Sequence, residues 1–116
     1  MKVSQFVVFT LILFMGCTTQ SVDLEQAQEV HLEAMEIAKV LRSDLTDMKS
    51  DSTQVVKADS LLNILNDWQA GVAEVPGFPH VHEEGHSHNH IQVRDSEQLN
   101  HQKQSLAAIK ELKNSL

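Results

Sequence analysis

Histidines gather in one short segment of this chain. Five of the eleven residues from position 80 to position 90 are histidines: His80, His82, His86, His88 and His90. In extended backbone, two histidines separated by one residue lie on the same side of the chain, about 6.5–7 Å apart. Gly85 allows the chain to fold back, so that imidazoles from both halves of the segment can meet. This spacing predicts a site for a metal ion.

The chemistry of imidazole narrows the choice of metal without deciding it. Three or four imidazoles can bind zinc at about 2.0–2.1 Å, and Glu83 or Glu84 can offer an oxygen ligand. Imidazole suits zinc, copper and nickel alike, and copper has the highest intrinsic affinity. The segment is therefore predicted to bind one of these three ions reversibly, because its spacing is not that of a closed structural zinc site.

Two other interpretations fit the same histidines. A polar segment of this composition also occurs as a solvated loop with no physiological ligand. The histidines would also change charge between about pH 5 and 8, as a pH sensor requires.

A second group of residues is compatible with copper chemistry. His31 and Met35 are one helical turn apart and so lie side by side, with His101 elsewhere in the chain. Met35 is at the edge of an apolar stripe, so we interpret it as a packing residue and His31 as an exposed histidine. Trp68 is interpreted as a core anchor.

The spacing of apolar residues predicts three helices to position these groups. Residues recur at intervals of three and four, as on one face of an amphipathic helix. The first helix is expected over residues 22–49, the second over 52–70, and the third from Asp95 or Ser96 to 116. The inner positions of the third helix are Leu99, Gln102, Leu106, Ile109, Leu112 and Leu116.

Side chains near the expected helix ends supply start and stop signals. Asp23 and Asp51 each precede a glutamine by three residues, a pattern typical of helix starts. Gly71 is expected to cap the second helix at its C-terminal end.

The fold class follows from these helices. No strand alternation of convincing length appears, and the breakers Pro76, Gly77, Pro79 and Gly85 all lie between residues 72 and 94. We therefore predict an all-α protein, an antiparallel three-helix bundle with a long His-rich loop over residues 72–94. The second helix would return this loop to the end where the first helix begins.

Composition limits the functions open to the chain. Its 116 residues, with 16 Asp and Glu against 9 Lys and Arg and a net charge of −7, indicate one small acidic domain. Such acidity argues against nucleic acid as a partner, since phosphates are bound by Lys and Arg. No nucleotide-binding loop, catalytic cysteine or nucleophile triad is recognised, so an enzyme is not expected.

The first residues have the layout of a signal peptide. A charge at Lys2 is followed by an apolar run from Phe6 to Met15, interrupted only by Thr10. About ten apolar residues are too few to span a bilayer. We therefore predict a removable leader over residues 1–16, a tether over 17–21 and a helical domain over 22–116.

The only cysteine follows this leader directly. Residues 14–17, Phe-Met-Gly-Cys, resemble the lipobox of bacterial lipoproteins. The resemblance implies a diacylglyceryl thioether and an acylated amino group on Cys17, which together give a stable anchor. Thr18, where Asp would retain a lipoprotein in the inner membrane, implies the periplasmic face of the outer membrane.

The rest of the chain resembles small three-helix lipoproteins of Bacteroidota, some of which carry the label viral A-type inclusion protein. The similarity rests on residues 29–35 (EVHLEAM), 66–68 (NDW) and 102–106 (QKQSL). It implies a helical envelope lipoprotein and carries over no catalytic residue. We expect a lipid-anchored metal-binding protein or, as the alternative, a structural module that binds another envelope protein and no metal.

Overall fold

A computed structural model describes residues 21–78 and 92–116, and this part of the chain contains three helices and no strands. They are α1 (Val22–Met48), α2 (Val55–Gly71) and α3 (Asp95–Asn114). The prediction of an all-helical protein is confirmed. None of the described helices is both long and apolar enough to cross a membrane.

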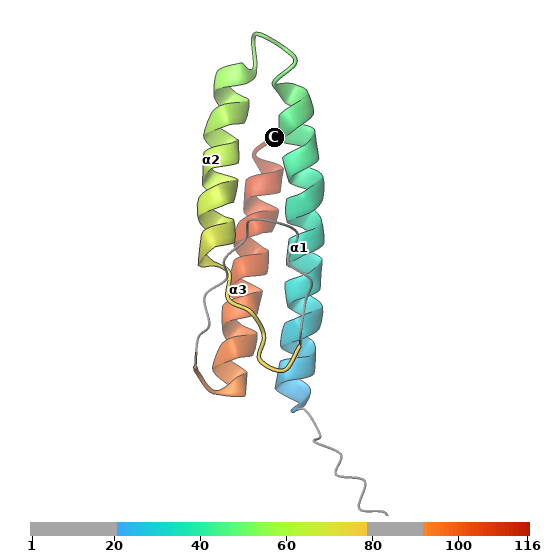
Figure 1. Cartoon of the computed structure of the whole chain (residues 1–116), viewed down its shortest axis with the longest axis vertical. Helices are drawn as coiled ribbons and strands as arrows, with labels where there is room; N and C mark the ends of the chain where they lie inside the picture. The colour runs from blue at the N-terminus through green and yellow to red at the C-terminus, as the bar shows by residue number, and fades with distance from the viewer. Residues whose placement is uncertain (1–20, 79–91) are drawn as a thin grey trace, which may run out of the picture.

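The three helices lie side by side, and α2 runs in the opposite direction to α1 and α3 (Figure 1). The most extensive helix contact is between α1 and α3. Because α2 is the shortest helix, it covers only part of the length of α1. Beyond Gly71 the chain continues without helical structure to Phe78. We call the end of the molecule where α1 and α3 begin the proximal end, and residues 72–78 the strap.

Helix α1 begins at residue 22, as predicted, but its N-cap lies two residues before the start signal at Asp23. Its N-cap is Ser21, whose Oγ accepts a hydrogen bond from the backbone N–H of Leu24 at 3.3 Å. Asp23 instead lies in the first turn, where a carboxylate complements the helix dipole. Asp95 and Glu97 hold the same place in α3, where Glu97 also accepts from the backbone N–H of Arg94 at 3.2 Å.

The turn between α1 and α2 is longer than predicted. Asp51 does not cap α2. Its carboxylate closes the turn, accepting hydrogen bonds from the backbone N–H and hydroxyl of Thr53 at 2.9 and 2.7 Å and from the amide of Gln54 at 3.2 Å. Helix α2 therefore begins at Val55, after the N-cap Gln54.

These hydrogen bonds lower the pKa of the Asp51 carboxyl group. The side-chain bond from Thr53 is the main cause that lowers the pKa of Asp51, followed by the backbone bond from Thr53 and the bond from Gln54. Thr53→Ala is expected to raise this pKa toward its ordinary value, whereas Ser52→Ala should leave it unchanged. An NMR pH titration of the carboxyl group measures both shifts. Because the pKa of Asp51 is lower in the folded state than in the unfolded state, its ionised carboxylate stabilises the folded state. This stabilisation is complete above the unfolded-state pKa and is lost as the pH falls through the folded-state pKa.

The end of α2 also differs from the prediction. Gly71 is the last helical residue and Val72 is the C-cap in extended conformation. Among the described residues, the glycine with positive φ is Gly77, at 83°. Gly71 therefore continues the helix, and the left-handed position lies six residues later, in the strap.

The apolar residues form two clusters. The distal core contains Ala34, Ala38, Leu41, Leu45, Leu61, Leu65 and Ile109. The proximal core is smaller and contains Ala27, Val75 and Leu99, against which Leu24, Val30 and Phe78 pack. The expectation that Leu116 is an inner residue is wrong, because α3 ends at Asn114 and Leu116 is 45% exposed.

Candidate functional site

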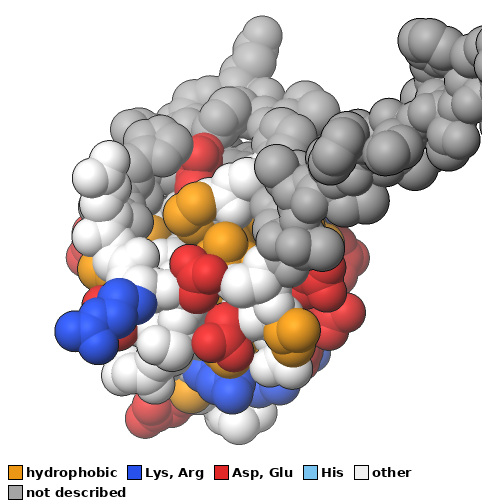
Figure 2. All heavy atoms as spheres, turned by 90° about the horizontal axis from the view of Figure 1, so that it is seen from below, with side chains coloured by type: hydrophobic (Ala, Val, Ile, Leu, Met, Phe, Trp, Pro, Cys, Tyr) orange, Lys and Arg blue, Asp and Glu red, His pale blue; other side chains and the backbone are white. Residues whose placement is uncertain are grey.

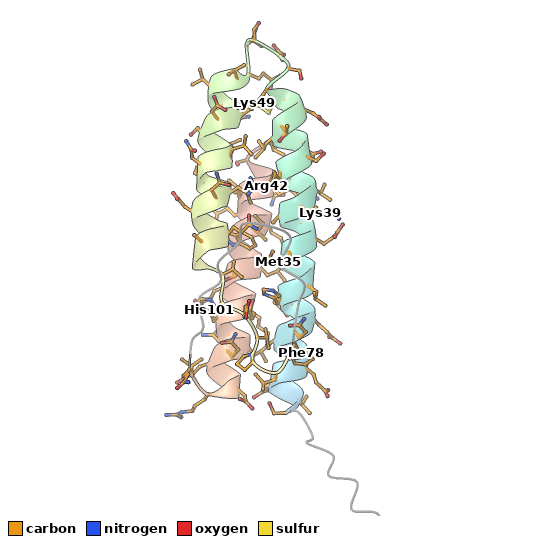
Figure 3. All side chains as sticks on the ribbon, in the orientation of Figure 1. Met35, Lys39, Arg42, Lys49, Phe78 and His101 are labelled. Atoms are coloured by element: carbon orange, nitrogen blue, oxygen red, sulfur yellow. The ribbon has the colours of Figure 1, made fainter. Side chains whose placement is uncertain are left out.

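The predicted metal ligands lie outside the described residues. This holds for His80, His82, His86, His88, His90, Glu83 and Glu84. The described residues on either side of them are Phe78 and Gln92. Phe78 packs on the proximal core, and residues 92–94 lead into the start of α3 (Figures 1 and 3). The histidine segment is therefore attached on both sides to the proximal end. Cys17 also lies outside the described residues.

The proximal end carries negative charge. Asp23 and Glu25 lie in the first turn of α1, and Asp95 and Glu97 in the first turn of α3. Figure 2, which looks onto this end, shows acidic side chains interspersed with hydrophobic ones, and basic side chains toward the edge of the view. A surface of this sign attracts cations toward the segment attached to it.

Residues 21–78 and 92–116 contain no group of three or more His, Cys, Asp or Glu side chains able to hold a metal ion. The second predicted group is also placed differently from expectation. His31 is not exposed: it is 2% exposed and lies between α1 and α3. Met35 and His101 are partly buried, on α1 and α3 respectively (Figure 3).

A hydrogen-bond chain fixes the tautomer of His31. Nε2 of Gln102 donates to the carbonyl oxygen of Ala73 at 2.7 Å, so Oε1 of Gln102 is the atom that faces His31. Nδ1 of His31 lies 3.2 Å from that Oε1. An amide oxygen can only accept, so Nδ1 carries the proton and donates. This nitrogen is therefore engaged in the fold and is not a metal ligand in this arrangement.

Gln98 extends the same arrangement by one helical turn. Its Nε2 donates to the carbonyl oxygen of Glu74 at 2.9 Å. Gln98 and Gln102 are 1% and 0% exposed. We call His31, Gln98 and Gln102 the polar layer. In the sequence, this layer is indicated by two glutamines four residues apart, Gln98 and Gln102, on one face of the third helix. Only Gln102 was predicted to be an inner residue.

The strap, residues 72–78, is the described first part of the connection predicted over residues 72–94, and it is packed against the helices. Val72, Ala73 and Val75 are almost completely buried. The carbonyl oxygens of Ala73 and Glu74 accept the hydrogen bonds from Gln102 and Gln98, and buried backbone groups require such partners. The first seven residues of the predicted loop thus belong to the packed domain.

Hydrogen bonds from two side chains, Arg42 and Trp68, join α2 to the other helices. Nη2 of Arg42 donates to Oδ1 of Asn66 and Oε1 of Gln69, both at 2.8 Å, and so joins α1 to α2. Nε1 of Trp68 donates to the carbonyl oxygen of Ser105 at 2.9 Å, joining α2 to α3. Trp68 also packs against the distal core. Its surroundings are those of the predicted core anchor.

No protein-family model, curated protein or solved structure matches the chain. The function is therefore argued from the residues themselves: the histidine segment by its sequence, and the proximal end by its geometry and charge.

Proposed function

We propose that this protein is a lipid-anchored protein of the cell envelope that binds zinc, copper or nickel reversibly through His80, His82, His86, His88 and His90. The observation that carries the proposal is the density of imidazoles, five in eleven residues. Its role is that of a buffer, carrier or sensor of the ion, without catalysis. The anchor is Cys17, on the periplasmic face of the outer membrane.

The proposed architecture is an antiparallel three-helix bundle with the His-rich connection between α2 and α3. Phe78, which packs on the proximal core (Figure 3), and residues 92–94 (Figure 1) flank that connection and lie at the end where α1 begins. Cys17 precedes Ser21 by four residues, a reach of at most about 14 Å. These positions favour metal binding close to the lipid surface.

The charge of the proximal end supports a cationic ligand. Four carboxylates in the first turns of α1 and α3 lie where the flanks of the histidine segment are attached. They raise the local concentration of cations, while the imidazoles select transition metals over calcium and magnesium, which prefer oxygen ligands.

Titration calorimetry of the mature chain with zinc and with copper(II) at neutral pH tests the proposal. We expect saturable binding that is lost when all five histidines of the segment are replaced by Asn. His101→Asn is the matched control, because His101 lies on α3 outside the segment, and it should keep the binding. Affinity should weaken below about pH 6, where protonated imidazole no longer binds metal. Equal heats for the wild type and the fivefold variant would refute metal binding by this segment.

A second candidate function is binding of another envelope protein by the helices, with the histidine segment as a spacer. It is favoured by apolar side chains on the outer side of α2, where Val56 is 83% and Ile64 48% exposed. Deletion of residues 80–90 would then leave the cellular phenotype intact, whereas Val56→Asp would abolish it. The opposite pattern supports the metal-binding function.

A further inference from the structure

The polar layer divides the interior of the molecule into two parts. Along α1, His31 stands between Ala27 of the proximal core and Ala34 of the distal core. Along α3, Gln102 stands between Leu99 and Ile109, which belong to different clusters. Apolar contact between the two parts is therefore interrupted at the level of His31.

The proximal part is also built differently from the distal part. In the distal part α2 is the third element, whereas in the proximal part the third element is the strap. The strap has no helical hydrogen bonds of its own, and its carbonyl groups at Ala73 and Glu74 depend on side chains of Gln102 and Gln98. Val75 and Phe78 of the strap belong to or pack on the small proximal core.

Unpaired polar atoms weaken the closed state of this part. Oε1 of Gln98 and Nε2 of His101 are buried without a hydrogen-bond partner among the described residues. A buried polar atom that lacks a partner forfeits the hydrogen bonds it makes with water. Opening of the strap hydrates Oε1 of Gln98, and this gain offsets part of the contacts that opening breaks.

We propose that residues 22–31, 72–78 and 95–102 form a unit that opens and closes while the distal core stays folded. The strap detaches in this opening, the first turns of α1 and α3 that it covers then unwind, and Gln98 and Gln102 are the latch that holds the strap shut. Opening exposes Val72, Val75 and Leu99, which are buried in the closed state. This inference is independent of the proposed metal binding.

Native-state hydrogen exchange of the full chain, followed at low denaturant concentrations, tests the proposal. Amides of residues 26–31 and 99–102 should exchange through a partial opening whose free energy falls less steeply with denaturant, because it exposes less surface. Amides of 37–45, 61–68 and 106–112 should exchange only through a larger unfolding with a steeper dependence. Gln102→Ala should accelerate the proximal set about 10-fold or more and change the distal set less than about twofold. Gln104→Ala, an exposed glutamine on the same helix, is the matched control and should alter neither set.

A second variant keeps the test decisive if Gln102→Ala does not fold. Val75→Ala removes apolar contacts of the strap and leaves the polar layer intact, and it should accelerate the same proximal amides. A single exchange transition shared by all segments in the wild type would overturn the proposal. So would equal acceleration of proximal and distal amides in the folded variants.

Discussion

Replacement of Leu65 by Ala is expected to lower the free energy of unfolding by about 2–5 kcal/mol. Leu65 comes from the middle of α2 and is 0% exposed within the distal core. Its removal leaves a cavity between helices that are fixed by their other contacts. The free energy of unfolding of a natural domain is about 5–15 kcal/mol in total, so this loss is a large fraction of it.

The adjacent residue provides the control for this prediction. Ile64 is on the same helix but is 48% exposed, so Ile64→Ala should cost less than about 1 kcal/mol. Chemical denaturation, followed by the circular dichroism signal of the helices, measures the free energy of unfolding of both variants. Equal losses for the two variants would contradict the assignment of Leu65 to the core.

The helices could be predicted from the sequence because the pattern that indicates them is local. Apolar residues at intervals of three and four predicted α1 and α3 to within two residues at each end, since one buried face per helix imposes this period. The start of α2 was predicted three residues too early. Asp51 followed by Gln54 satisfies the pattern of a helix start, but here the carboxylate bonds to Thr53 and Gln54 inside the turn.

The polar layer could not be predicted from the sequence, and the reason is physical. His31 bonds to Gln102, which is 71 residues away, and Gln102 bonds to Ala73, 29 residues away. Buried polar residues are stable only when such partners are present, and no local pattern reveals a partner so distant. Without that information, His31 was interpreted as exposed, and the burial of the strap was not predicted. The histidine segment is recognised from composition alone, which gives the candidate ligands and not their arrangement.

Replacement of Cys17 by Ser is expected to abolish acylation of the protein completely. In the lipoprotein that we propose, the thioether with the diacylglyceryl group would form on the sulfur of Cys17, and no other cysteine in the chain could replace it. The acyl chains of this modification would supply the anchor, because each buried methylene group contributes about 0.8 kcal/mol and more than one chain is needed for stable attachment. The variant should therefore also leave the outer-membrane fraction.

Labelling of growing cells with a palmitate analogue, followed by membrane fractionation, measures this effect. Thr18→Ser, directly after the cysteine, is the matched control and should keep both the label and the membrane location. Label on Cys17→Ser would show that the acyl chains are attached elsewhere, and the lipobox assignment would be wrong. Metal titration of the same variant separates the two proposals: because the imidazoles are supplied by residues 80–90, binding should persist when the anchor is lost. A protein that keeps its metal affinity without acyl chains binds the ion by its own ligands, and the membrane then determines only where in the cell that binding takes place.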